Sequence, residues 1–143
     1  MKGVPDSFSQ SRIAFNAAAL GYYPPLERVE QYVQSHMREH VTLGIAASVA
    51  RLERKYFSAF FHSKVGVTFR DWNAILRVQR AMDIMRVRRS PVLRVAFAVG
   101  FNNVRSFERT FKKLTGITPQ AFRAAVERDS RFLSQESRIP ARR

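Results

Sequence analysis

One pattern of small and aromatic residues occurs twice in this chain, about fifty residues apart. The spacings after the first Phe are identical in the two copies, whereas the step from Ala to Phe is ten residues in the first copy and eleven in the second. Self-similarity at a fixed period indicates one supersecondary unit that is used twice. The first copy consists of Ala47, Phe57, Phe61, Gly66, Thr68 and Trp72, and the second of Ala96, Phe107, Phe111, Gly116, Thr118 and Phe122.

Hydrophobic periodicity predicts that the chain is all-α, with about seven helices. Apolar residues recur at steps of three and four from Leu26 onward, and no useful length of sequence alternates as a half-buried strand does. We expect the repeat to form two similar lobes joined by one long helix. The expected parts are a poorly defined N-terminal arm (1–25), the first lobe (26–68), the connector helix (69–88), the second lobe (90–128) and a basic, disordered tail (129–143).

The N-terminal arm is the least informative part of the sequence. A short helix from Phe8 to Leu20 with Gly21 as its C-cap is one interpretation, and a loosely packed arm is the other. Its aromatic residues, such as Phe15 and Tyr22, either cover an apolar patch or form a dimer contact. The sequence leaves both questions open.

Capping signals divide each lobe into short helices. Thr42 is a suitable N-cap for a helix over residues 43–50. Ser90 followed by Pro91 predicts the start of the corresponding helix in the second lobe, because Ser is a good N-cap and Pro fits the first helical position. Each lobe therefore contains a short helix, a turn and a longer helix.

The longer helix of the second lobe, residues 104–114, combines an aromatic buried side with a basic exposed side. Phe107 and Phe111 hold it against the core, and Arg105 and Arg109 project together at i, i+4. Like charges at this spacing destabilise a free helix slightly, and a polyanion removes that penalty. Such a helix fits the major groove of B-DNA, where Arg binds guanine O6 and N7.

Composition agrees with a nucleic-acid partner. The formal net charge is +14, and most of the 25 basic residues are Arg. Net charge informs about partners rather than about fold, and the guanidinium group binds phosphates and guanine edges in a bidentate manner. The chain has no Cys, and we interpret the pair His36 and His40 as the surface of a helix end. We expect no metal and no cofactor.

Other classes of protein find little support in the sequence. No apolar run is long enough to span a membrane, and the N-terminus lacks the apolar segment of a signal peptide. We therefore expect a cytoplasmic, nucleoid-associated protein. No phosphate-binding loop, nucleophile motif or carboxylate pair suggests an enzyme.

The second copy of the repeat resembles the C-terminal signature of the AraC/XylS family of bacterial transcription regulators. The residues that carry the resemblance are Val95-Ala96-Phe97-Ala98-Val99-Gly100-Phe101-Asn102-Asn103, then 106–113 and Gly116-Ile117-Thr118-Pro119, with Phe122-Arg123. The resemblance covers Leu26 to about Arg128. It implies two helix-turn-helix lobes that present recognition helices to successive major grooves of double-stranded DNA, with RNA polymerase as a further partner.

The first lobe departs from that family pattern on its exposed side. Arg51 stands where the pattern has a turn glycine, and a left-handed conformation there costs about 1 kcal/mol. Glu53 replaces the usual small N-cap, Ala59 replaces an exposed Arg, and His62 replaces Lys. The first lobe thus keeps its core and loses much of its base-recognition chemistry. We expect it to position the protein more than to specify sequence.

The candidate DNA-binding residues fall into two groups. The candidates for base contact are Arg105, Ser106, Arg109, Lys55 and Ser58. The candidates for phosphate contact are Arg51, Arg54, Asn102, Asn103, Lys112, Lys113 and Thr118.

Two alternatives to a sequence-specific regulator remain open at this point. One is a basic helical interaction protein that modulates another regulator, and the other is a nonspecific nucleoid binder. If the chain is a single-domain member of the family, the resemblance implies that it binds as a monomer to an asymmetric site of about two helical turns, each about 10 base pairs.

Overall fold

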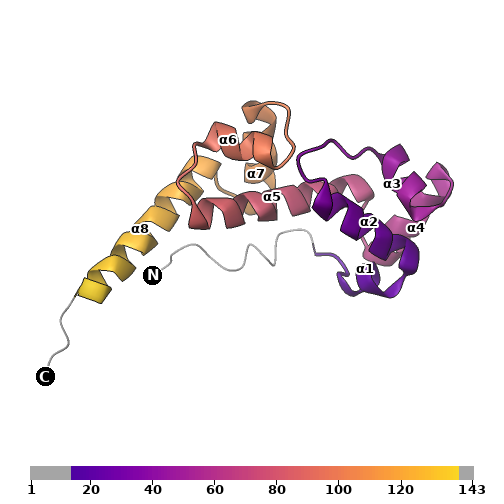
Figure 1. The fold of residues 1–143 in the computed structure, drawn as a ribbon, viewed down its shortest axis with the longest axis horizontal. Helices are drawn as coiled ribbons and strands as arrows, with labels where there is room; N and C mark the ends of the chain where they lie inside the picture. Colours follow the sequence, from indigo (N-terminus) through magenta and orange to yellow (C-terminus); the bar gives the residue numbers. More distant parts are fainter. Residues whose placement is uncertain (1–13, 139–143) are drawn as a thin grey trace, which may run out of the picture.

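Eight helices and no strand make up the part of the chain that the computed structural model describes, residues 14–138 (Figure 1). This confirms the all-α expectation, with one short helix more than the sequence predicted. The helices are α1 (Ala18–Tyr22), α2 (Pro24–Ser35), α3 (Leu43–Ala50), α4 (Arg54–Val65), α5 (Phe69–Val87), α6 (Val92–Ala98), α7 (Val104–Thr115) and α8 (Pro119–Arg138).

The first lobe packs α1 to α4 around an aromatic core that the start of α5 completes. Phe57 and Phe61 lie four residues apart on one side of α4 and are fully buried. Both rings pack edge-on against Phe69, and Phe61 also packs against Trp72. Aromatic rings bury large apolar areas, so two turns of α4 are fixed against α5.

The second lobe repeats this arrangement with α6, α7 and the start of α8 around the other end of α5. Phe107 and Phe111 take the places of the first two rings, and Phe122 takes the place of Trp72. Phe101 adds a ring at the turn before α7, 5.3 Å from Phe107 between centroids. The two halves of the sequence repeat therefore become two cores with the same internal packing.

Helix α5 belongs to both lobes and joins them. At 1.5 Å per residue its 19 residues span about 28 Å. Its first turns face the first core, and Ile75, Val78, Met82 and Met85 face the second. Figure 1 shows α5 running from the first lobe to beneath α6 and α7, with α8 extending away from the body of the molecule. A single helix thus sets the separation between the two lobes.

Most of the predicted helix ends are confirmed. The Thr42 and Thr68 hydroxyls accept hydrogen bonds from the backbone N–H groups of Ile45 and Asp71, at 3.1 Å each. Thr118 does the same for Ala121 at 3.0 Å. Each bond satisfies a donor that the first turn of a helix leaves unpaired.

The predicted start of α6 is wrong by one residue. Ser90 is not the N-cap; Pro91 is, with an extended backbone and no side-chain capping bond. The Pro91 carbonyl instead accepts from the N–H groups of Arg94 and Val95, at 3.0 and 3.1 Å. The helix therefore begins just after the proline rather than at it.

The two ends of the described chain are more ordered than we expected. Residues 1–13, which include Phe8, lie outside the described part, but α1 continues through Gly21, and Leu20 is buried in the first core. Residues 14–25 are therefore an integral part of the first lobe. At the other end, α8 includes residues 129–138, because no Gly or Pro interrupts the sequence between positions 120 and 139. Residues 139–143 of the expected tail lie outside the described part.

Candidate nucleic-acid interface

Each lobe contains a tight turn between its short and its longer helix, and the two turns share their hydrogen bonds. Leu52 donates to the carbonyl of Ala47, and Phe101 donates to that of Ala96, both at 3.0 Å. The preceding residue is left-handed in both lobes: Arg51 has φ 61° and Gly100 has φ 97°. The structure thus confirms the expected helix-turn-helix geometry, including the unfavourable backbone at Arg51.

The longer helices, α4 and α7, begin with different caps. The Glu53 carboxylate accepts from the backbone N–H of Tyr56 at 3.0 Å, and the Asn103 side chain accepts from that of Ser106 at 2.8 Å. The bond from Tyr56 is the largest cause that lowers the pKa of Glu53. Asn103 rather than Asn102 is the cap of α7. One negative charge therefore lies at the start of α4, whereas α7 begins with a neutral cap.

The exposed side of α7 carries a net positive charge. Arg105, Arg109 and Lys112 line one shallow hollow together with Thr118 and Gln120. Glu108 adds one negative charge to the same hollow, and its carboxylate accepts a hydrogen bond from the Gln120 amide at 2.7 Å. Among the described side chains, none of these three cations makes a salt bridge. They are therefore available to an external anion.

A second hollow lies between the two lobes, with a volume of about 610 Å³. Helix α4 contributes Ser58 to it, and α7 contributes Ser106 and Thr110. Asn102 and Asn103 lie at its edge, and the start of α5 adds Arg70. Hydroxyl groups from α4 and α7, amide groups from the α6–α7 turn and the Arg70 guanidinium of α5 therefore line one cleft, beside apolar residues such as Leu43 and Phe101.

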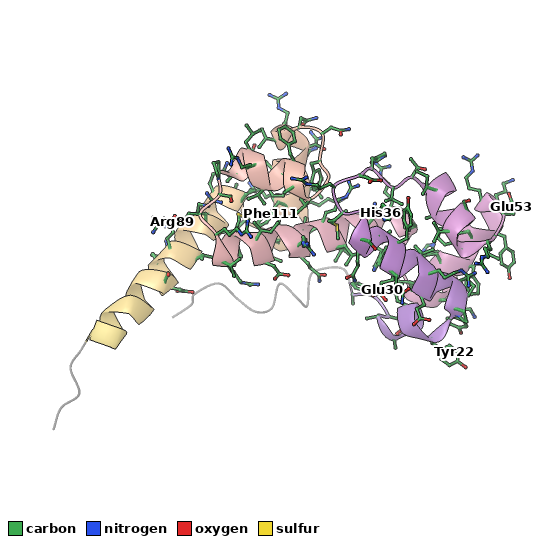
Figure 2. All side chains as sticks on the ribbon, viewed as in Figure 1. Tyr22, Glu30, His36, Glu53, Arg89 and Phe111 are labelled. Atoms are coloured by element: carbon green, nitrogen blue, oxygen red, sulfur yellow. The ribbon has the colours of Figure 1, made fainter. Side chains whose placement is uncertain are left out.

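The structure thus does not bring all the predicted site residues together on one surface. The α7 hollow holds Arg105, Arg109, Lys112 and Thr118, and the interlobe cleft holds Ser58, Ser106, Asn102 and Asn103. Lys113 is exposed on α7 outside both hollows. The remaining candidates, Arg51, Arg54 and Lys55, are exposed on the first lobe. Figure 2 shows Glu53, next to them in sequence, at the outer edge of that lobe and far from Phe111 in the second.

Sequence reasoning missed three residues of this region. Tyr56 leaves 58% of its surface exposed on α4, where Ser106 stands on α7. Arg70 lines the cleft, and its position two residues after the Thr68 cap was an available signal. Arg28 donates to the carbonyls of Val49 and Ala50 at the end of α3, at 3.2 and 2.8 Å. No sequence pattern indicated that last contact, which joins residues 21 and 22 positions apart.

One expectation for the connector helix is wrong. The sequence predicts a solvated basic face on this helix with Arg70, Arg77, Arg80 and Arg86, but only 9% of Arg77 is exposed. Its guanidinium donates to the Glu39 carbonyl at 3.2 Å and lies over the Phe101 ring, 5.6 Å from its centroid. The packing of the α6–α7 turn against the loop before α3 buries this side of α5, and such a contact leaves no periodic signal.

Other kinds of site find no support in the part of the chain that the structure describes. No group of three acidic or His side chains is arranged to hold a metal ion there. None of the described helices combines the length and apolar character that crossing a membrane requires.

Known proteins share both the sequence pattern and the fold. A family model described as a helix-turn-helix domain matches residues 46–125. The arabinose operon regulatory protein of Salmonella typhimurium is 31% identical over 110 residues, which are 73% of this chain and 39% of that protein. The uncharacterized HTH-type transcriptional regulator YobQ of Bacillus subtilis is 30% identical over 100 residues, 70% of this chain and 42% of that protein.

Among solved structures, the DNA-binding domain of AdpA in complex with a target DNA has a TM-score of 0.68 and 27% identity, with 72% of this chain and 93% of that chain covered. The fold and the sequence together define a DNA-binding domain with two helix-turn-helix units. The chain belongs to the AraC/XylS family of transcription regulators. It spans about two fifths of the length of the curated relatives named above. The matched relatives are transcription regulators and not enzymes.

Proposed function

We propose that this protein regulates transcription by binding a specific DNA sequence, with α4 and α7 in successive major grooves and with α7 making most of the base contacts. One observation carries the proposal: α7 exposes Arg105 and Arg109 without a carboxylate partner, whereas the equivalent places on α4 are Lys55 and Ala59. Arg forms bidentate hydrogen bonds with guanine, and Ala forms none.

The dimensions of the fold support two successive contacts. An α-helix with its side chains is about 10–12 Å wide and the major groove is about 12 Å wide. The length of α5, about 28 Å from its 19 residues, is close to one turn of B-DNA, about 34 Å. In this arrangement the cleft between the lobes faces the sugar-phosphate ridge that separates the two grooves. We propose that Ser58 and Ser106, which the sequence suggested as base-contact residues, bind phosphates of that ridge together with Arg70.

Because the two lobes differ in their exposed side chains, we propose that one copy binds an asymmetric site as a monomer. A single chain already supplies both recognition helices. We also propose that the protein acts on chromosomal DNA in the nucleoid. A palindromic site occupied by two copies contradicts this part of the proposal.

A contact with RNA polymerase needs a surface that stays free on DNA, and the outer side of α6 is such a surface. A groove there is lined by Arg80, Arg88 and Arg94 beside the half-exposed Phe97. No residue of α4 or α7 lines it. We propose this groove as the place where the polymerase touches the DNA-bound protein.

Salt dependence separates DNA binding from the alternative of an acidic protein partner. With about six to ten phosphate contacts, affinity for DNA falls by about 10³ to 10⁵ between about 50 and 200 mM salt. Fluorescence anisotropy with labelled duplexes measures this slope. A flat response favours the protein-interaction alternative, and equal affinity for all duplexes favours the nonspecific nucleoid binder.

A further inference from the structure

The two lobes touch each other at a small junction beside the interlobe cleft. The junction consists of Arg77 from α5, Gly100 and Phe101 from the α6–α7 turn, and Met37 and Glu39 from the loop between α2 and α3. Apart from α5 itself, few residues connect the lobes. The junction therefore limits how far one lobe can rotate against the other.

Arg77 holds the junction through two different contacts. Its Nη2 atom donates to the Glu39 carbonyl of the first lobe at 3.2 Å, and its guanidinium lies over the Phe101 ring of the second lobe. Burial lowers the pKa of Arg77, but an arginine stays charged at neutral pH. One cation on the shared helix thus binds both lobes at once.

Gly100 brings the second lobe close enough for these contacts. A Cβ atom at this position would lie 2.6 Å from the Met37 carbonyl oxygen and 3.2 Å from Nε of Arg77. A real Cβ atom essentially never lies 2.6 Å from a backbone oxygen, so any side chain at Gly100 requires the turn or the loop at Met37 to shift. The glycine is needed here for an interlobe approach as well as for its backbone angle of φ 97°.

Phe15 closes the junction from another direction. Its side chain packs against the cores of both lobes. The N–H of the next residue, Asn16, donates to the Val65 carbonyl at 2.8 Å, which anchors this segment at the end of α4. In Figure 1 the short coloured segment before α1, residues 14–17, lies on the side of α5 opposite to α6. The lobes are therefore tied together on two sides of the connector helix.

From these contacts we infer that Arg77 is a positioning residue that fixes the angle between the lobes and so determines which spacing between two DNA half-sites the protein accepts. The expected effect on half-site spacing rests on the proposed function, binding to two successive grooves. The expected effect on the angle between the lobes does not depend on DNA. Two binding modules held at a fixed geometry gain affinity only for targets that match that geometry. Loosening the junction lowers affinity for the matched site and broadens the accepted spacings.

The structural part is tested by the distance between two spin labels, one on each lobe. The chain has no Cys, so Ser63→Cys on α4 and Ala124→Cys on α8 give two unique, exposed attachment points. Pulsed electron paramagnetic resonance then gives the distance distribution. Arg77→Met keeps the apolar stem and removes the donors, and Arg80→Ala on the exposed side of α5 is the matched control.

We expect Arg77→Met to broaden the distance distribution, and Arg80→Ala to leave it narrow. Phe15→Ala, which acts from the other side, serves as a second variant, and circular dichroism establishes that each variant stays helical. If Arg77→Met unfolds the lobes, Phe15→Ala must still broaden the distribution. A distribution as narrow as that of the parent protein in a folded Arg77→Met variant overturns the inference.

The DNA part is tested by selecting bound duplexes from a library with two half-sites at varied spacing. The parent protein should select one spacing, and Arg77→Met should select several while losing about tenfold in affinity for the preferred one. An unchanged single spacing for Arg77→Met overturns the inference. If the parent protein selects no site at all, the proposed function fails, whereas the label distances still decide the role of Arg77.

Discussion

Arg51 and Gly100 occupy the same place in the two lobes, the left-handed residue of the turn, yet they have different surroundings. Arg51 is exposed at the periphery of the first lobe, so only its own backbone conformation is unfavourable. Gly100 is buried against the other lobe, where a Cβ atom has no room. The same turn therefore tolerates an arginine in one copy and requires a glycine in the other.

The exposed side chains of α4 and α7 differ as well. In the first lobe α4 presents Arg54, Lys55, an Ala and an exposed Tyr56, behind a Glu53 cap that adds negative charge. In the second lobe α7 presents Arg105, Arg109 and two Lys residues behind a neutral cap. The two cores are alike because the same packing maintains both halves of the fold, whereas the exposed side chains differ.

The largest expected effects come from the cores, where the lobes should behave alike. Phe57→Ala and Phe107→Ala each remove a fully buried ring and should each lower the free energy of unfolding by about 3–5 kcal/mol. Urea denaturation followed by circular dichroism measures both. A cost below about 1 kcal/mol for either variant would show that the two cores are not equivalent.

On DNA the lobes should differ. Arg109→Ala should weaken binding to the selected site by about 1–3 kcal/mol, and should weaken binding to random DNA much less. Lys55→Ala should weaken both to a similar, smaller extent, because a phosphate contact carries no sequence information. Titrations of both variants against both duplexes give the four affinities. If both variants lose the preference for the selected site over random DNA to the same extent, the proposed division into base contacts in the second lobe and phosphate contacts in the first is contradicted.

The turn of the first lobe should respond oppositely to that of the second. Arg51→Gly relieves the left-handed backbone and should raise the free energy of unfolding by about 1 kcal/mol. Gly100→Ala should lower it by more than about 1 kcal/mol, because strain at positive φ adds to the clash with Met37. Thermal melts of the two variants test this. Stabilisation by both substitutions would mean that Gly100 does not approach the first lobe.

The smallest expected effect concerns pH. The pKa of Glu53 is lowered in the folded protein by its bonds to backbone N–H groups, so this cap contributes stability above the unfolded pKa and loses it as pH falls through the folded value. Asn103 does not titrate. Hydrogen-exchange protection of the Tyr56 amide should therefore fall between about pH 6 and about pH 3, while that of Ser106 stays constant. Parallel changes at both amides would assign the effect to global unfolding.

The sequence predicted the repeated core, the two helix-turn-helix units and most caps, because these depend on local spacing. Thr42, Glu53 and Thr118 each satisfy a donor within three residues, and such short contacts leave a pattern in the sequence. Contacts between distant segments do not. Arg77 and Phe15 looked like a surface cation and part of a loose arm until the fold placed both between the lobes.

The spacing of residues in the sequence likewise predicted only part of the candidate site. Arg105 and Arg109 were expected to share a surface and do. Ser106, between them in sequence, instead turns toward the interlobe cleft, where it lies with Ser58. Helical periodicity predicts which residues share one face of a helix. Which residues of the other lobe lie opposite that face depends on the angle between the lobes.

Selection of bound sites from fully random DNA tests most directly whether base recognition is concentrated in the second lobe. The account predicts one strongly specified half-site and, about one helical turn away, a weakly specified one. Arg109→Ala should erase the strong half-site alone. Two equally specified half-sites, or a strong half-site that survives Arg109→Ala and is lost with Lys55→Ala, would contradict the account.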